Sequence, residues 1–522
     1  MQLHDALRSR AGKVFQRTEE AFDSAFGGAG NPLRHLGALG LFFLWILVAT
    51  GLYLYTVLDT SVTGVYESIG DLSTPYWSFG GIVRSLHRYA SDGFVIAMFL
   101  HLLREWAFRR YKGFRHFSWV TGVPLIWLAF ISAIGGYWIV WDQVAQFSAT
   151  ATTELLDWLP IFSEPAARNF LAPDSINDRF FTVLVFIHIG VPLMLLLALW
   201  AHVNRISHVD YLPSRPLMAG TTGVLLLLAL TLPAISGAPA DLAHVAAEVR
   251  LDWFVLFIHP LSEQLSAPVT WALLLGGTAL LAALPYLRRE PSAPVAVVDR
   301  PNCNGCSRCH VDCPYEAITM VPHPGKTAHQ LALVDPALCA SCGICAGSCP
   351  SSTPFRSQDT LVTGIDMPQQ PLDRLRQQLV DGLERLRGTT PVVVFGCDHA
   401  APAESLAGED TLALSLLCVG MLPPSFVEYA LRSGADGVVV TGCRDSGCAF
   451  RLGTGFTRER LLHRREPHLR DSVPRDRLLI HFASSADGPD LRRAVADFRH
   501  RLAVAPASPR PPSFRRRKPH NA

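Results

Sequence analysis

Long apolar runs dominate the first 290 residues of the sequence. Six of them are long enough to cross a membrane as helices, and they lie at 36–56, 80–103, 120–140, 179–200, 217–236 and 268–287. The first thirty residues mix charged and apolar positions instead, which predicts an amphipathic surface helix. An even number of spans places both ends of this six-helix transmembrane bundle on the same side of the membrane.

Basic residues indicate which side that is. Lys and Arg gather before the first run, after the second, after the fourth and just after the sixth, whereas the alternate loops hold only Arg168 and Arg250. Loops rich in Lys and Arg stay in the cytoplasm. We therefore expect a multi-pass protein of the cell inner membrane, with its N- and C-termini in the cytoplasm.

After residue 290 the pattern changes to that of water-soluble domains. A cysteine-dense block, predicted to form an α+β ferredoxin-like domain, is followed by buried strands at 391–396, 412–417 and 437–441 and a helix at 425–433, typical of a small α/β parallel-sheet domain. The Pro- and Arg-rich tail is expected to be disordered. The expected domains are 1–35 (amphipathic segment), 36–290 (membrane), 295–360 (cysteine block), 390–485 (parallel sheet) and 503–522 (tail).

Composition agrees with a chain that is partly in lipid. The 522 residues are 49% apolar and 17% charged, and the net charge of +2 gives no reason to expect nucleic acid as a partner. All twelve cysteines follow residue 300, on the predicted cytoplasmic side. Because thiols stay reduced there, a disulfide framework is not expected.

Four histidines repeat a fourteen-residue spacing within two predicted spans, His87 and His101 on the second and His188 and His202 on the fourth. Fourteen residues return a helix to nearly the same face, about 21 Å along its axis. Two such helices could form an outer pair, His87 with His188, and an inner pair, His101 with His202, each able to ligate a haem iron. Alternatively, each histidine is a polar residue hydrogen-bonded within the bundle, although intramembrane ionisable residues are usually functional.

Glycines repeat the same spacing, Gly37 with Gly51 and Gly122 with Gly136, and we interpret them as room for the edges of two porphyrins. With these residues and the runs 84–87 (RSLH), 101–104 (HLLR) and 136–138 (GYW), residues 31–287 resemble the cytochrome b family of quinol-oxidising complexes. The resemblance implies two b-type haems. It also implies that Arg84 and Arg104 pair with haem propionates, the alternative being basic side chains that extend to the membrane surface.

The same resemblance implies an outer quinone site. Residues 251–254 (LDWF) are similar to the family's Pro-Glu-Trp-Tyr motif, with Asp252 at the position of the carboxylate that accepts a proton from quinol. Asp252 could equally be an ordinary charge at the membrane surface. Cytochromes b of this family are usually dimers, so a homodimer is possible.

Eight cysteines form two C-x2-C-x2-C-x3-C-P runs, at 303–314 and 339–350. This is the two-cluster bacterial ferredoxin pattern, in which the fourth cysteine of each run binds the other cluster. One [4Fe-4S] cluster is assigned to Cys303, Cys306, Cys309 and Cys349, and the other to Cys339, Cys342, Cys345 and Cys313. Zinc is the alternative, but zinc modules pair two cysteines with two more after a long gap.

Four more cysteines follow predicted strands, where a parallel sheet can bring them to one edge; they are Cys397, Cys418, Cys443 and Cys448. Four thiolates suit a [2Fe-2S] cluster, and redox-silent buried thiols are the alternative. The run 434–448 (GADGVVVTGCRDSGC) resembles the delta subunit of methyl-viologen-reducing hydrogenases. That resemblance implies a cytoplasmic partner such as a hydrogenase, a formate dehydrogenase or a heterodisulfide-reductase-like complex.

These features together predict an electron-transfer protein that acts as a quinone/quinol oxidoreductase subunit of a larger complex. Electrons would pass between quinone and the soluble partner through the two haems and the three clusters. Two alternatives stay open: a Q-cycle-type quinol-oxidising core with a Rieske-type partner, and a membrane anchoring or assembly subunit.

Overall fold

The computed structural model describes residues 2–160, 171, 175–244, 248–287, 293–326, 329–352, 360–444, 447–485 and 487–504. The chain divides into two compact units, one comprising Met1–Asn204 with Val209–Arg289 and the other Arg205–His208 with Glu290–Ala522. The expected tail, 503–522, lies outside the described residues apart from positions 503 and 504.

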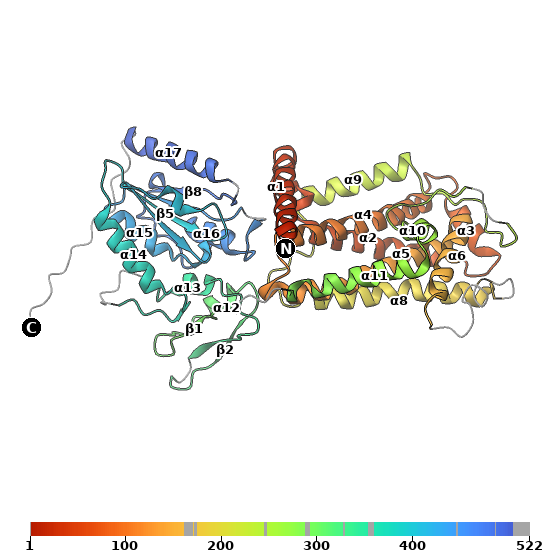
Figure 1. Cartoon of the computed structure of the whole chain (residues 1–522), viewed down its shortest axis with the longest axis horizontal. Helices are drawn as coiled ribbons and strands as arrows, with labels where there is room; N and C mark the ends of the chain where they lie inside the picture. Colours follow the sequence, from red (N-terminus) through yellow and green to blue (C-terminus); the bar gives the residue numbers. More distant parts are fainter. Residues whose placement is uncertain are drawn as a thin grey trace, which may run out of the picture. The chain divides into compact units, whose positions relative to one another are not determined.

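The first unit is helical (Figure 1). Its helices are α1 (Gln2–Gly30), α2 (Leu36–Val57), α3 (Gly64–Leu72), α4 (Phe79–Ala107), α5 (His116–Val140), α6 (Gln143–Asp157), α8 (Asp178–Val203), α9 (Arg215–Thr231), α10 (Ile258–Gln264) and α11 (Ala267–Ala283).

Within the described residues, four segments are long and apolar enough to cross a membrane, and they are Leu36–Val57, Gly113–Val140, Asp178–Val203 and Ala267–Tyr286. The other two expected spans coincide with α4 and α9. Helix α4 is 29 residues long but carries charges such as Arg88 and Asp92, and α9 is apolar but has only 17 residues.

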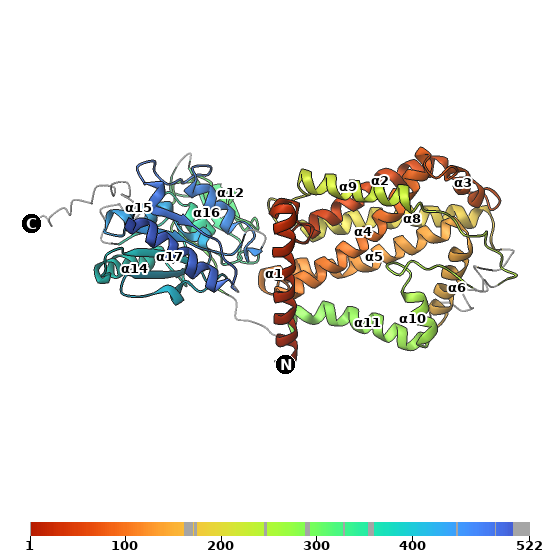
Figure 2. The ribbon, with the colours of Figure 1, turned by 90° about the horizontal axis from the view of Figure 1, so that it is seen from above.

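Helix α2 packs along α4, and α5 packs along α8. Helix α1 lies across one end of these helices, and α3, α6 and α10 lie at the opposite end (Figures 1 and 2). The mixed polarity of α1 explains its place, because a helix with many charged residues is stable at the end of an apolar bundle and not inside it. The four central helices carry the predicted histidines and glycines.

The second unit begins with the cysteine-dense block. Two antiparallel strand pairs, β1 (Val297–Val298) with β4 (Ile365–Asp366) and β2 (Ile318–Pro322) with β3 (Gln330–Val334), accompany two short helices, α12 (Arg308–Val311) and α13 (Ile344–Ser348). Each helix starts at a residue with positive φ, Ser307 for α12 and Gly343 for α13. The two cysteine runs thus have the same local form, a loop that turns into a short helix.

A four-stranded parallel sheet follows, in the order β6-β5-β7-β8. Its strands are β5 (Val392–Cys397), β6 (Thr411–Leu416), β7 (Gly437–Val440) and β8 (Leu478–Ile480), and its helices are α14 (Leu372–Arg385), α15 (Pro424–Arg432), α16 (Gly453–Leu461) and α17 (Gly488–Val504). The predicted parallel sheet is therefore confirmed, with one strand, β8, and two helices, α16 and α17, that the sequence reading did not identify.

Alternate residues of the central strands pack on opposite faces of this sheet. Val393 and Phe395 belong to one apolar cluster with Leu379 of α14, and Val394 belongs to another with Phe498 of α17. Strands buried on both faces read as continuous apolar runs, which is why the sequence pattern predicted β5 and β7 well. The ends of these strands position the last four cysteines.

Candidate redox centres

The four spaced histidines face each other in the two pairs that the spacing predicts. His87 on α4 and His188 on α8 have their ring centres 6.3 Å apart. His101 on α4 lies close enough to His202 on α8 for the two to interact electrostatically. Each pair therefore joins the same two helices at a different depth. Their role as haem ligands stays a prediction.

Three of these imidazoles are held through their Nδ1 atoms. His188 Nδ1 lies 2.9 Å from the Ser132 carbonyl, so it carries a hydrogen and donates it. His87 Nδ1 lies 2.9 Å from Thr50 Oγ1, and His202 Nδ1 lies 3.3 Å from Thr121 Oγ1. Holding Nδ1 fixes the ring and leaves Nε2 for a metal.

Each of the four glycines stands directly against one of these imidazoles. A Cβ atom at Gly136 would lie 2.9 Å from His188 Cε1, and one at Gly51 would lie 3.1 Å from His87 Cε1. Gly122 faces His202 at 3.1 Å and Gly37 faces His101 at 3.7 Å. From the sequence, we interpret these glycines as room for the porphyrin edges. In the structure, the lack of a Cβ at each glycine lets a histidine ring of α4 or α8 pack against α2 or α5.

The spacing of the outer pair fits an iron with two axial imidazoles. Two metal–nitrogen bonds of about 2 Å, added to the distance from each nitrogen to its ring centre, would place the two ring centres about 6 Å apart. The observed separation of His87 and His188 is 6.3 Å. The donor set, two neutral imidazoles in an apolar bundle, is also the one that b-type haems use.

The two arginines that were expected to meet haem propionates already contact protein groups. Arg84 donates to Ser73 Oγ at 2.6 Å and to Ser236 Oγ at 2.8 Å. Arg104 is buried and donates through Nε to Glu19 Oε1 of α1 at 2.7 Å. Arg104 therefore also fastens α1 to α4, and the pairing of either arginine with a propionate stays a prediction.

Asp252 lies in a buried, charged cluster and not on an open surface. It is 8% exposed, accepts a hydrogen bond from Tyr137 Oη at 2.6 Å, and forms an ion pair with Arg88 at 2.7 Å. Burial alone would raise the pKa of Asp252, but Arg88 and the Tyr137 hydroxyl outweigh it and keep that pKa below its ordinary value. Arg88 also pairs with Asp92 at 2.5 Å. Asp252 is therefore not an ordinary surface charge, and its role as the quinol-site carboxylate stays a prediction.

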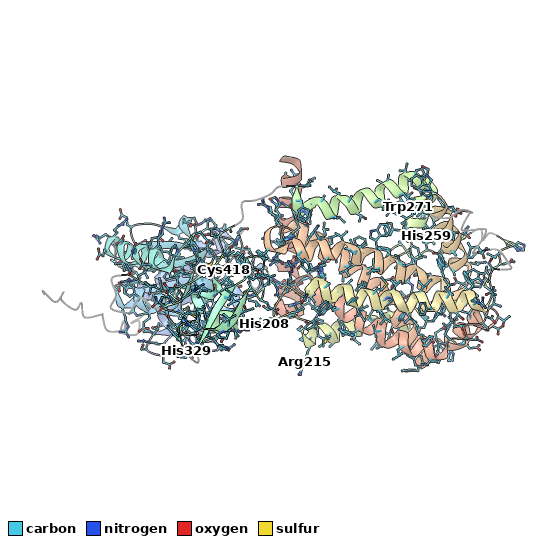
Figure 3. All side chains as sticks on the ribbon, turned by 90° about the horizontal axis from the view of Figure 1, so that it is seen from below. His208, Arg215, His259, Trp271, His329 and Cys418 are labelled. Carbon is cyan, nitrogen blue, oxygen red and sulfur yellow. The ribbon has the colours of Figure 1, made fainter. Side chains whose placement is uncertain are left out.

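A second polar group lies on the short helix α10. His259, labelled in Figure 3, is 2% exposed and its Nε2 lies 3.1 Å from Ser148 Oγ and 2.9 Å from Thr152 Oγ1 of α6. Trp271 of α11, also labelled, donates to the Leu155 carbonyl of α6 at 2.7 Å. Helix α6 is thus anchored to α10 and α11 by buried hydrogen bonds.

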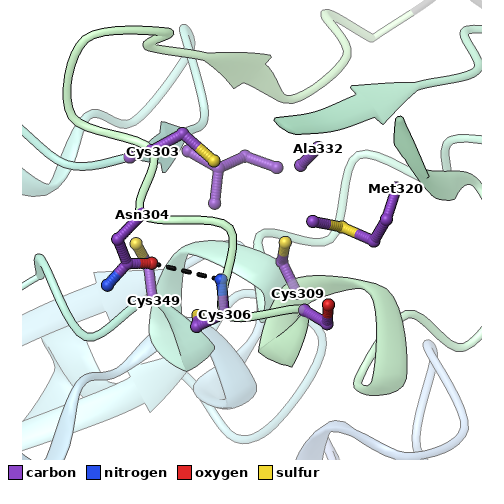
Figure 4. Close-up of a pocket in the computed structure, with 10 residues that line it drawn as sticks. Cys303, Asn304, Cys306, Cys309, Met320, Ala332 and Cys349 are labelled. Carbon is purple, nitrogen blue, oxygen red and sulfur yellow. Dashed lines mark hydrogen bonds between the residues drawn. The ribbon is translucent and has the colours of Figure 1, made fainter. Parts of the chain in front are cut away.

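Four cysteines from both ferredoxin-type runs line a single pocket (Figure 4). Cys303, Cys306 and Cys309 come from the first run and Cys349 comes from the second, as the crossed pattern predicts. Apolar residues such as Met320 and the polar residues Asn304 and Ser307 complete the lining, and a Cβ at Gly364 would lie 3.3 Å from Cys349 Sγ. A pocket lined by four thiols has the donor set and the crowding expected around an iron–sulfur cluster.

The other four ferredoxin-type cysteines also gather. Cys345 interacts electrostatically with Cys342, Cys313 and Cys339, the set assigned to the second cluster, and with Cys309 of the first. Burial raises the pKa of Cys342, and likewise that of Cys309, to about 12. Because thiols with so high a pKa remain protonated at neutral pH, they would become thiolates only on binding a metal. The two sets therefore lie side by side.

The last four cysteines form a closed ring at one edge of the parallel sheet. Cys397 interacts with Cys418 and Cys443, and Cys448 interacts with the same two. All four are buried, with exposed fractions of 4% or less. Gly453 at the start of α16 is in close contact, since a Cβ there would collide with Cys418 Sγ. Four buried thiols facing one another fit a cluster better than four unrelated thiols would.

Comparison with known proteins supports the same division of the chain. Three segments of the chain match models of redox families. Residues 31–209 match the model for cytochrome b/b6/petB, residues 302–353 match that for the 4Fe-4S dicluster domain, and residues 392–504 match that for the delta subunit of methyl-viologen-reducing hydrogenase. These matches confirm the three resemblances, in the order in which they were predicted.

Among solved structures, one titled "Hyperthermophilic respiratory Complex III" is similar at 19% sequence identity, with a TM-score of 0.40, covering 49% of this chain and 76% of that one. The family matches by themselves support an integral-membrane electron-transfer protein. The cytochrome b segment implies haem, and the dicluster segment implies iron–sulfur chemistry.

Sequence reasoning missed several residues that the structure places in these centres. Arg88 and Asp92 in the cytochrome b segment lie beside Asp252. Their opposite charges, four residues apart inside a predicted span, could have indicated a buried ion pair. Arg460 in the hydrogenase-delta segment has no such signal, because its side-chain partners Asp312 and Ser348 are more than a hundred residues away in sequence.

Proposed function

We propose that this chain passes electrons between the membrane quinone pool and a soluble cytoplasmic redox partner. Two b-type haems, on His87 with His188 and on His101 with His202, would carry electrons across the membrane part. Two [4Fe-4S] clusters on the crossed cysteine sets and a [2Fe-2S] cluster on the last four cysteines would carry them further. The partner would be of the hydrogenase, formate dehydrogenase or heterodisulfide-reductase type.

The observation that carries this proposal is the number and type of the sites. The helical unit holds two facing histidine pairs, and the second unit holds three sets of four cysteines, the last of which is wholly buried. Every one of these donor sets suits a one-electron carrier. A chain that served only as an anchor would not need five such sets.

The membrane arrangement is part of the same proposal. Helices α4 and α9 would cross the membrane with the four apolar spans, giving six crossings and placing both termini and all the cysteines in the cytoplasm. Charged residues of α4 would then face the bundle, where Arg88 is paired with Asp92 and Asp252. A ferredoxin-like fold for residues 295–360 and a homodimer of the membrane part complete the arrangement.

Quinol oxidation is assigned to the cluster around Asp252. Removing two electrons from a quinol also releases two protons, so a carboxylate close to the quinol would assist the reaction. Tyr137 and Arg88 hold Asp252 by hydrogen bond and ion pair, and its low pKa keeps it ionised, the state in which it can accept a hydrogen bond from a quinol hydroxyl.

The test uses the purified, anaerobic full-length chain. One sample receives a quinol analogue and another receives a low-potential one-electron donor, while haem absorbance and cluster EPR are recorded together. We expect quinol to reduce the haems, and the donor to reduce the clusters, the haems and added quinone. Haems that respond to neither quinol nor quinone would refute the quinone assignment and favour an anchoring subunit.

A further inference from the structure

One arginine is fully buried where the cysteine-dense block meets the parallel-sheet domain. Arg460 of α16 is 0% exposed. Its Nη1 donates to the Gly420 carbonyl at 2.8 Å, and its Nη2 donates to Asp312 Oδ2 and to Ser348 Oγ, both at 2.5 Å. Asp312 balances the charge and also pairs with Arg465 at 2.6 Å.

The three partners of Arg460 are chain neighbours of cysteines from all three sets. Asp312 directly precedes Cys313 and Ser348 directly precedes Cys349, the two cysteines that cross between the ferredoxin-type runs. The amide of Gly420 donates to Cys418 Sγ, at 3.4 Å, in the last set. A single guanidinium group therefore links the backbone around all three sets.

Residues next to the second and third cysteine sets are also in contact. Ile344, next to Cys345, is fully buried, and a Cβ at Gly420 would lie 2.8 Å from its Cγ1 atom. A Cβ at Gly453 would lie 3.7 Å from Ile344 Cδ1, and it would also collide with Cys418 Sγ. A packed connection between the two domains thus runs from Cys345 through Ile344 and Gly453 to Cys418.

We infer that Arg460 is the positioning residue that holds the third cysteine set against the second, and that electrons pass between their clusters across the contact of Ile344 with Gly453. This inference rests on the proposed function, since it requires the clusters. The step moves one electron: the cluster that gives it is oxidised by one unit and the cluster that receives it is reduced by one unit. No bond forms or breaks, and no proton needs to move.

Arg460 should also influence the potentials of the clusters. A reduced cluster with four thiolates is anionic, and a buried cation close to it stabilises the reduced form, which raises the reduction potential. Asp312 acts in the opposite sense. Loss of the Arg460 charge should therefore lower the potentials of the neighbouring clusters, and loss of the Asp312 charge should raise them.

The experiment compares the anaerobic full-length protein with three variants. Arg460→Met removes the charge, Arg460→Lys keeps the charge but loses the planar fork, and Asp312→Asn removes the opposite charge in nearly the same shape. Arg458→Met, two residues earlier on α16, is the matched control, because Arg458 lies over the ring of Phe482. The readouts are iron content, the EPR-monitored potential of each cluster and the magnetic coupling between the second and third clusters.

We expect Arg460→Met to lower the cluster potentials and to weaken the coupling, and Asp312→Asn to raise the potentials. Arg460→Lys should keep wild-type potentials with partly weakened coupling. Arg458→Met should change neither readout. Unchanged potentials and coupling in Arg460→Met with all clusters present would overturn the inference. If Arg460→Met loses its clusters, the potentials of Asp312→Asn test the inference instead. A positive shift of the cluster potentials would support it, and no shift or a negative shift would overturn it. Coupling of the third cluster to the first in place of the second would refute the route.

The wild-type measurement separates this inference from the proposed function. Wild-type protein that contains no third cluster contradicts the proposed function itself. Wild-type protein that contains all three clusters, with potentials insensitive to both charge changes, contradicts only the role of Arg460.

Discussion

Small residues stand against the side chains that would hold the cofactors. Gly136 faces His188, and Gly453 faces Cys418. In both cases a close neighbour along the same helix, Gly135 or Gly455, has open space where a Cβ would be. At the residue scale the protein therefore contains two matched pairs of glycines, in which only one member should be sensitive to substitution.

Gly136→Ala should disturb the outer histidine pair. Its new Cβ would lie 2.9 Å from His188 Cε1, and such overpacking typically lowers the free energy of unfolding by about 1–3 kcal/mol. We expect the haem absorbance of the purified protein to fall by about half, because the inner pair is untouched. Gly135→Ala should bind haem like the wild type, and equal haem loss in the two variants would contradict the prediction.

Gly453→Ala should remove the third cluster selectively. The added methyl group would collide with Cys418 Sγ, and a thiolate displaced from its position cannot ligate iron. EPR should show the two [4Fe-4S] signals without the third signal. Gly455→Ala should retain all three signals, and an intact third signal in Gly453→Ala would show that Cys418 is not a ligand.

At the scale of elements, helix α17 completes the parallel-sheet domain. Its apolar face packs on the sheet through residues such as Val495 and Phe498, opposite the face covered by α14. A parallel sheet needs cover on both faces to avoid exposing apolar strands to water. Without α17, Val392, Val394 and Val439 would lose that cover, so the domain that holds the last four cysteines depends on a helix far from them.

Val495→Ala should destabilise this domain. Val495 is 5% exposed, and removing two buried methyl groups costs about 2 kcal/mol. Val504 on the same helix is 70% exposed, so Val504→Ala makes the same chemical change without loss of packing. Thermal unfolding of the two variants should give a clearly lower Tm for Val495→Ala only, and equal Tm values would mean that α17 does not cover the sheet in solution.

At the scale of the whole molecule, the haems and the clusters should act in series. His101→Leu removes one imidazole of the inner pair, a proposed haem ligand, and replaces it with an apolar side chain. A low-potential donor should then still reduce the clusters but should reduce the outer haem more slowly, whereas quinol should still reduce the outer haem directly. Stopped-flow absorbance together with EPR measures both steps.

His116→Asn is the matched control for His101→Leu. His116 lies at the exposed start of α5, and its Nδ1 lies 2.9 Å from the Gly113 carbonyl. It should transfer electrons like the wild type. An outer haem that the low-potential donor reduces equally fast in His101→Leu would show that the inner histidine pair is not on the path.

The sequence by itself determined the features that depend on local spacing. Fourteen-residue repeats of His and Gly on two pairs of helices, two C-x2-C-x2-C-x3-C-P runs and the apolar runs of β5 and β7 are properties of neighbouring positions in the chain. A regular helix or strand turns such spacing directly into geometry. For that reason the histidine pairs, the crossed cysteine sets and the central strands could be predicted residue by residue.

Only the tertiary structure decided which distant groups meet. Arg460 and Asp312 are 148 residues apart, Tyr137 and Asp252 are 115 apart, and neither pair repeats at any helical or strand period. Such contacts form because a buried charge must find a partner wherever the fold brings one, and spacing along the chain does not encode that. The same holds for α17, because its sequence does not show which sheet its apolar face covers.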